Sequence, residues 1–261
     1  MKSMSLFTMP IAVALVLLAS SIQLSAADKK DPLHVNDPVL RSLLDSHITA
    51  IGGWSNWNAV SSMRLRGQIE REGQTIDCVF VKKRPNLIRA TLTLPIAGNK
   101  NQSLQMIRAH NGKHAWSTTR MSGAQEALNH KILNGSEANA LLGDAGVEPL
   151  LIQFWKSEAK LTLCASELVG GQHCFVIKAS ATKLDGDYLF YLSTKNLRLL
   201  RREHVHPKEG RTVTDYNDYQ TIEGVSIARR QTIDSSQTGH TIVTIQGIDL
   251  GIGIYADYFN Q

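Results

Sequence analysis

The residue pair with the most reactive chemistry is Ser157 and Lys160, which have the S-x-x-K spacing of enzymes in which a lysine assists a serine nucleophile. The companion motifs of those enzymes are absent, and the serine falls where a helical pattern gives way to a strand pattern. The sequence also contains no G-x-S-x-G, no H-E-x-x-H and no glycine-rich phosphate loop. We therefore expect a protein that is not an enzyme and that uses no cofactor.

His204 and His206 could begin a metal site, because alternation along a strand puts both imidazoles on one face. Asp215 or Asp218 on the following strand could add a third ligand. Three basic residues nearby oppose cation binding: Arg201, Arg202 and Lys208. A solvated polar face is the favoured interpretation, and we expect no bound metal. Alternation also puts Asp215 and Asp218 on opposite faces, so we do not expect a catalytic carboxylate pair.

The first 27 residues have the three-part pattern of a secretory signal peptide. Lys2 supplies a short positive region, residues 7–19 are almost entirely apolar, and Ser25-Ala26-Ala27 offers small residues at the cleavage positions. The apolar run is shorter than the about 20 residues that a membrane-spanning helix needs. We therefore expect cleavage near Ala27, export to the periplasm, and a mature chain, residues 28–261, that does not span a membrane.

Composition excludes some classes of partner. Hydrophobic residues make up 43% of the chain, which is enough for a real core and too many for a disordered protein. The 28 basic residues exceed the 23 acidic ones only slightly and are spread along the chain. Nucleic-acid binding requires a clustered basic stripe, so we expect no nucleic-acid partner.

Three cysteines cannot all pair with one another. Cys164 and Cys174 flank a predicted turn at Gly170-Gly171, and an oxidising compartment would permit a disulfide between them. A two-residue turn would set Cys164 opposite Ile177 and point the two sulfurs to opposite faces, although a longer loop could realign them. Unpaired cysteines are the favoured interpretation, with Cys78 as a small core residue.

An amphipathic helix is predicted near the start of the mature chain. Asp37-Pro38 reads as an N-cap followed by proline at the first helical position. Apolar residues recur at helical spacing from Val39 to Ile51, and Gly52-Gly53 ends the run. The apolar stripe of this helix must cover another part of the protein.

Strand patterns with a period of two begin at Met63. A turn at Glu72-Gly73 leads into the second strand, and the apolar faces of the two strands coincide in one register: Leu65 opposite Phe80, Gly67 opposite Cys78 and Ile69 opposite Ile76. Further strands are predicted at 87–94, 102–110, 114–119, 160–167, 172–179, 188–192, 197–206, 211–218, 225–233 and 240–248.

Residues 122–156 interrupt the strands with a helical pattern. Short helices are predicted at 124–133, 136–142 and 147–155, the last with Pro149 in its first turn. The whole pattern indicates one mainly β (α+β) domain of about eleven or twelve strands, with an N-terminal helix and a helical insert.

Several stretches, in order along the mature chain, make the sequence similar to the outer-membrane lipoprotein-sorting (LolA/LolB-like) periplasmic superfamily. They are His47–Gly53 before the first strand, the bend and strand Lys83–Arg89, the hairpin Asn111-Gly112-Lys113-His114-Ala115-Trp116, and the later hairpins Glu167–Gln172 and Asp215–Val225. The resemblance implies an incomplete, curved antiparallel β-barrel with helices across its open mouth. It also implies a cavity that receives the acyl chains of lipoproteins, or a sensor of mislocalised lipoproteins or lipopolysaccharide.

These considerations lead to two expectations for function. The first is a periplasmic carrier that holds a lipid or a lipidated protein by its hydrocarbon chains, without catalysis. Its expected cavity lining is Leu65, Ile69, Ile76, Phe80, Leu92, Ile107 and Trp116. The alternative is a regulatory or scaffold module that binds another envelope protein.

Overall fold

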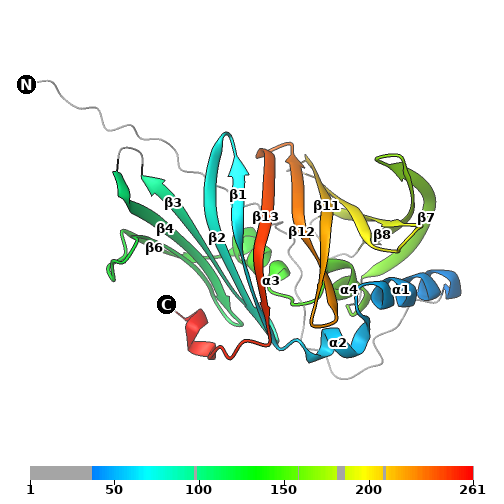
Figure 1. Ribbon diagram of the computed structural model, residues 1–261, viewed down its shortest axis with the longest axis horizontal. Helices are drawn as coiled ribbons and strands as arrows, with labels where there is room; N and C mark the ends of the chain where they lie inside the picture. The colour runs from blue at the N-terminus through cyan, green and yellow to red at the C-terminus, as the bar shows by residue number, and fades with distance from the viewer. Residues whose placement is uncertain (1–36, 97–98, 158, 181–185, 208–209, 261) are drawn as a thin grey trace, which may run out of the picture.

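The computed structural model describes residues 37–96, 99–157, 159–180, 186–207 and 210–260, so the predicted signal peptide, residues 1–27, lies outside the described residues. The described residues form one antiparallel sheet of 13 strands that does not close into a barrel (Figure 1). This confirms the predicted mainly β fold with an incomplete barrel and a few helices. Within these ranges, no helix combines the length and the apolar character that crossing a membrane requires.

The order of the strands shows two meanders joined side by side. Along the sheet it runs β6-β5-β4-β3-β2-β1-β13-β12-β11-β10-β9-β8-β7, so the pairing of β1 with β13 connects the halves. The strands are β1 (Ser62–Arg71), β2 (Gln74–Lys83), β3 (Leu87–Ile96), β4 (Asn99–Asn111), β5 (Ala115–Met121), β6 (Asn129–Leu133), β7 (Lys160–Val169), β8 (Gln172–Ser180), β9 (Asp187–Ser193), β10 (Leu199–His206), β11 (Gly210–Ile222), β12 (Val225–Ser235) and β13 (Gly239–Leu250).

In the described part of the chain, four α-helices and a 3-10 turn accompany the sheet: α1 (Pro38–Ala50), α2 (Gly53–Ala59), α3 (Gly135–Asp144), α4 (Leu150–Trp155) and η1 (Ala256–Phe259). We call the sheet face that carries Leu65 and Phe80 the inner face. Helices α1 and α4 pack on it, because Leu44 and Phe154 share an apolar cluster with Phe190 of β9. The face opposite to it is the outer face.

The predicted N-terminal helix is confirmed. Asp37 caps α1 by accepting hydrogen bonds from the backbone N–H of Val39 at 2.9 Å and of Leu40 at 3.3 Å. Gly52 follows the helix with φ +122°, and a Cβ there would lie 2.2 Å from the carbonyl oxygen of Gly224. This glycine therefore permits a close approach between the end of α1 and the β11–β12 turn.

The first hairpin has the predicted register, and the helical insert differs from the prediction. Leu65 lies opposite Phe80 and Ile69 opposite Ile76. The predicted helix 124–133 is wrong, because residues 129–133 form strand β6 and extend the sheet beyond β5, which gives 13 strands instead of about eleven or twelve. The helix at 136–142 is present as α3, and α4 begins at Leu150, with Pro149 as its N-cap residue.

The cysteines are all free thiols, as expected, but the predicted face of Cys164 is wrong. Cys174 lies opposite Glu167 as expected, but an irregularity between Cys164 and Glu167 sets Cys164 opposite Val176. Because Val176 and Cys174 are two residues apart on β8, Cys164 and Cys174 lie on the same face.

Candidate functional site

A cavity of about 230 Å³ lies between the inner face of the sheet and the helices. Most of its wall is apolar, and both layers contribute to it: Ile51, Trp57, Leu65, Phe80, Leu151 and Ile245. Closely packed protein interiors contain few voids larger than a water molecule. An apolar void of this size under a helical cover is therefore the leading candidate for a binding site.

Strand alternation brings the sheet side of the cavity together. Leu65 of β1 lies opposite Phe80 of β2, and Gly67 lies opposite Ile245 of β13. A Cβ at Gly67 would lie 2.0 Å from the carbonyl oxygen of Thr244, so only glycine allows this approach.

Trp57 supplies the cavity with an aromatic ring whose polar atom is already satisfied. Its indole N–H donates to the carbonyl oxygen of Ile51 at 3.0 Å, within the segment that joins α1 to α2. The ring can therefore line an apolar space without leaving a buried donor unpaired.

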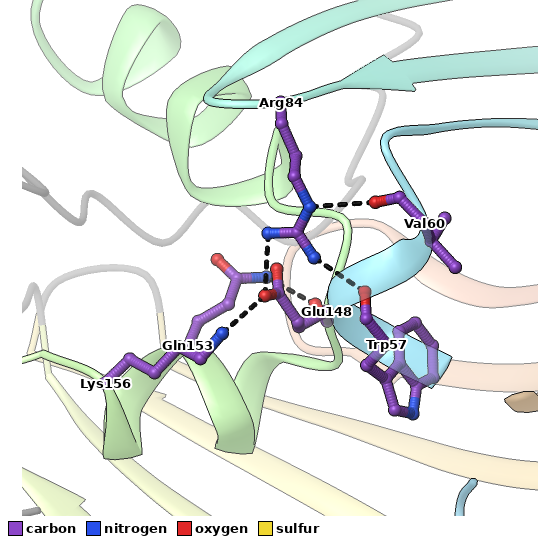
Figure 2. A network of polar contacts seen from close by, with 6 residues as sticks. All are labelled: Trp57, Val60, Arg84, Glu148, Gln153 and Lys156. Carbon is purple, nitrogen blue, oxygen red and sulfur yellow. Dashed lines mark hydrogen bonds and ion pairs between the residues drawn. The ribbon is translucent and has the colours of Figure 1, made fainter. Parts of the chain in front are cut away.

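Glu148 is the centre of a polar network that ties the helical insert to α2 and to the β2–β3 turn (Figure 2). Its Oε1 accepts hydrogen bonds from Arg84 Nη1 at 2.8 Å and from Lys156 Nζ at 2.7 Å. Arg84 also donates to the carbonyl oxygens of Trp57 and Val60, each at 2.8 Å, where α2 ends. Burial acts to raise the pKa of Glu148, but the hydrogen bonds and charges of Lys156 and Arg84 outweigh it and lower this pKa.

Gln153 completes the network from inside the insert. Its Nε2 donates to the backbone carbonyl oxygen of Glu148 at 2.7 Å (Figure 2). A Cβ at position 146 would lie 2.2 Å from the Gln153 amide, so Gly146 leaves the room that this side chain occupies. The network residues Glu148 and Gln153 both line the cavity, so the insert is fixed at the cavity wall.

One part of the cavity wall is charged, with Lys82 from β2, Arg202 from β10 and Asp144 from the end of α3. Lys82 Nζ donates to the carbonyl oxygen of Gly146 at 3.1 Å. Burial lowers the pKa of Lys82, against the charges of Asp144 and Glu148. Burial raises the pKa of Asp144 to about 7, although Lys82, Arg202 and Arg108 act to lower it.

His47 is a buried polar residue that anchors α1 beside the cavity. Its Nδ1 donates to the carbonyl oxygen of Leu197 at 2.6 Å, in the connection between β9 and β10. Burial lowers the pKa of His47 to about 4, partly offset by this hydrogen bond. The imidazole is therefore neutral at physiological pH and adds no charge to the cavity.

Five of the seven predicted lining residues lie together on the inner face. Leu65 and Phe80 line the cavity itself. Ile69, Ile76 and Leu92 belong to an adjoining apolar cluster, which shares four buried residues with the cavity wall: Phe80, Ile233, Val243 and Ile245. Whether any of them contacts a ligand stays a prediction.

Ile107 and Trp116 are not with the others, and their predicted face is wrong. Leu92 lies opposite Met106, so Ile107 points to the outer face, and Trp116 lies opposite Ala109 on that same face. There the indole N–H of Trp116 donates to the carbonyl oxygen of Phe259 at 3.0 Å. The physical reason is that the C-terminal segment covers this part of the outer face, so apolar residues occur on both faces of β4 and β5.

The residues considered for catalysis or metal binding are also apart. Ser157 Oγ donates to the carbonyl oxygen of Phe154 at 2.8 Å at the end of α4. His204 stacks on Tyr188 on the inner face, with ring centroids 4.2 Å apart, whereas Asp215 accepts two hydrogen bonds from Arg201 on the outer face. Among the described residues, no group of three or more His, Cys, Asp or Glu side chains could hold a metal ion.

The charged residues of the cavity wall were not predicted from the sequence. Lys82 lies two residues after Phe80, and Arg202 lies two residues before His204, so alternation alone could have placed each on its strand face. Asp144 had no such indication, because its position depends on how α3 meets the sheet.

Comparison with known proteins shows likeness in structure. No family model matches the sequence, and no curated protein matches it. A domain assigned to outer membrane lipoprotein sorting, from Vibrio parahaemolyticus, has a TM-score of 0.55 at 12% identity, with 84% of this chain and 95% of that chain covered.

Two further solved structures agree with the first. A LolA superfamily protein from Nitrosomonas europaea has a TM-score of 0.54 at 13% identity and covers 85% of this chain and 97% of its own. A DUF1329 family protein from Desulfovibrio piger has a TM-score of 0.51 at 12% identity, with coverages of 88% and 98%. The chain therefore has the LolA-like fold, as the resemblance of its motifs predicted.

Proposed function

We propose that this chain is a periplasmic binding protein that holds the hydrocarbon chain of a lipid or of a lipidated protein in the cavity, without catalysis. The observation that carries the proposal is the largely apolar cavity of about 230 Å³ on the inner face of an open sheet, under helices. The LolA-like fold and the predicted signal peptide support it. A carrier needs no reactive group, which agrees with the separation of Ser157, His204 and Asp215.

The size of the cavity limits what fits without rearrangement. A cavity of about 150 Å³ binds benzene, so about 230 Å³ corresponds to a chain of roughly eight to ten carbons. Each buried methylene contributes about 0.8 kcal/mol, so eight of them contribute about 6 kcal/mol before the costs of binding. Longer acyl chains require displacement of the helical insert, which the Glu148 network holds in place.

A cavity-filling variant tests the proposal without removing any packing contact. Ala228 lines the cavity and is 8% exposed, so Ala228→Phe would add a ring that occupies most of the space. We expect wild type to bind 1-octanol in a calorimetric titration and Ala228→Phe to bind it at least 100-fold more weakly. Ala165→Phe on the exposed edge strand β7 is the matched control and should bind normally. Normal binding by folded Ala228→Phe would place the ligand elsewhere.

A second candidate, a module that binds another envelope protein, is favoured by a different feature. The sheet is open, and β7 is an edge strand with mostly exposed side chains. An exposed edge can pair with a strand from a partner. The variant Thr162→Pro would test this candidate. If it no longer captured an envelope protein but still bound 1-octanol normally, the result would support a partner-binding edge.

A further inference from the structure

Arg202 is a buried cation that the protein leaves nearly without partners. It is 3% exposed and lines the cavity. Its guanidinium makes one hydrogen bond with the described residues, from Nη2 to Thr214 Oγ1 at 3.4 Å. A guanidinium has five N–H donors, and a buried charge is costly unless it is paired and hydrogen-bonded.

Other arginines of the same strands have a carboxylate partner. Arg201 donates to both oxygens of Asp215, at 2.7 and 3.0 Å, and Arg211 donates to both oxygens of Glu203, at 2.7 and 3.1 Å. Both pairs lie on the outer face. Arg202 is more buried than either of these arginines, yet no carboxylate of the described residues lies within 4.0 Å of its guanidinium nitrogens.

The charges of the cavity wall do not balance. Lys82 and Arg202 are its cations, and Asp144 and Glu148 are its carboxylates. The carboxylate of Glu148 is already shared by two cations of the network in Figure 2. Apart from Glu148, whose charge also attracts Lys82 but which is hydrogen-bonded to two other cations, the lining residues offer Lys82 and Arg202 only the carboxyl group of Asp144. Positive charge therefore exceeds negative charge at this wall.

We propose that Arg202 binds the oxyanion headgroup, a carboxylate or a phosphate, of a single-chain amphiphile whose hydrocarbon chain lies in the apolar part of the cavity. The inference rests on the proposed function and adds the class of headgroup. The planar guanidinium can hold two oxygens of such a headgroup at once. The ammonium group of Lys82, in the same cavity wall, also attracts the anionic headgroup.

Two further polar atoms at the cavity have no partner of their own. Asp144 Oδ2 and Ser226 Oγ are buried, and neither is hydrogen-bonded within the described part of the chain. Both residues line the cavity. Because the pKa of Asp144 is raised to about 7, its carboxyl is partly protonated at neutral pH and can then donate to an oxyanion. When ionised, Asp144 opposes the anion instead.

Four probes of matched chain length separate headgroup from chain: octyl phosphate, octanoate, 1-octanol and inorganic phosphate, each titrated by calorimetry into the full mature chain. We expect octyl phosphate and octanoate to bind at least tenfold more tightly than 1-octanol, because charge-assisted hydrogen bonds are added to the same chain. Inorganic phosphate, which lacks the chain, should bind at least 100-fold more weakly than octyl phosphate.

Substitutions then assign the headgroup to Arg202. Arg202→Met should weaken octyl phosphate far more than 1-octanol and so remove the preference between them, and Arg202→Lys should keep part of the preference. Asp144→Asn should tighten octyl phosphate severalfold, because it removes an opposing charge without changing shape. Arg230→Met, on an exposed arginine of β12, is the control and should change nothing. Thermal unfolding establishes that each variant is folded, and Asp144→Asn keeps the test informative if Arg202→Met does not fold.

The results that would contradict the headgroup assignment differ from those that would contradict the proposed function. Equal binding of 1-octanol and octyl phosphate, unaffected by Arg202→Met, would overturn the headgroup assignment and leave the proposed function standing. Inorganic phosphate binding as tightly as octyl phosphate would show a free-anion site and overturn the amphiphile. Absence of binding by all four probes would overturn the proposed function together with this inference.

Discussion

Replacing Glu148 with glutamine should loosen the helical insert without removing any hydrocarbon from the core. Glutamine keeps the shape of the side chain and one acceptor oxygen, but it removes the charge shared by Arg84 at 2.8 Å and Lys156 at 2.7 Å. Hydrogen bonds to ionised groups are roughly twice as strong as neutral ones. The closed position of α4 against α2 should therefore become less stable than in wild type.

The magnitude follows from the burial of the three side chains. Glu148 is 7% exposed, and the side chains of Arg84 and Lys156 are 32% and 30% exposed. Breaking a fully buried ion pair costs about 3–5 kcal/mol, and breaking an exposed pair costs about 0–1 kcal/mol. Because water reaches both cations, the expected cost lies between these limits, at about 1–3 kcal/mol, which corresponds to roughly 5- to 150-fold more frequent opening.

Amide hydrogen exchange measured on peptides from residues 135–156 reports this opening directly. Exchange there should accelerate in Glu148→Gln, while exchange in β12 and β13 stays slow. Glu137→Gln is the matched control, since Glu137 lies on the same insert but is 46% exposed and pairs with Lys131 at the surface. A double-mutant cycle with Arg84→Met should show a coupling of about 1–2 kcal/mol.

Two results would refute this reasoning. Unchanged exchange across 135–156 in Glu148→Gln would mean that apolar packing alone holds the insert. Uniformly faster amide exchange across the whole sheet would mean that the network stabilises the entire fold and does not act on the insert alone.

Three further predictions concern other parts of the fold. Gly52→Ala should cost about 2 kcal/mol or more in urea unfolding, because its φ is +122° and its Cβ would meet a backbone carbonyl, whereas Gly53→Ala, with no atom within 4 Å of its Cβ, should cost less. His47 has its folded pKa lowered from 6.5 to about 4, so the neutral form is favoured and stability should fall by up to about 3 kcal/mol as pH drops from 6.5 to 4; His47→Asn should flatten this decline in pH-dependent unfolding, and an equal decline in both proteins would contradict it. Trp116→Phe should cost about 1 kcal/mol through its lost hydrogen bond and leave 1-octanol affinity unchanged, since Trp116 lies on the outer face; weaker octanol binding would argue against this placement.

Local sequence patterns were sufficient to predict a helix or strand wherever one face of that element is buried and the element that it packs against is close in sequence. The cap at Asp37 and the helical spacing up to Ile51 predicted α1, because capping and amphipathicity both act within the segment. The β1–β2 register followed from the requirement that Leu65 and Phe80 share the buried face.

The failures have a common physical origin in contacts that are distant in sequence. Residues 129–133 have apolar spacing compatible with a helix, and pairing with β5 decides that they form a strand. The irregularity in β7 moves Cys164 by one position, which reverses its face. Ile107 and Trp116 are buried by the C-terminal segment, so their hydrophobicity did not identify the inner face.

The candidate site was predictable only where it depends on alternation along a strand. Alternation placed Leu65 and Phe80 on the cavity side, and the same rule could have placed Lys82 and Arg202. The contribution of Asp144 and Glu148 could not be foreseen, because it depends on how the insert packs across the sheet.

The proposed carrier function requires that the cavity holds a hydrocarbon chain in the cell. Native mass spectrometry of the protein extracted without detergent from cells of its source organism tests this, with Ala228→Phe prepared in parallel. Wild type should carry the added mass of one amphiphile, and Ala228→Phe, equally folded, should carry none. A wild-type mass equal to that of the bare polypeptide, or the same added mass in both proteins, would contradict it.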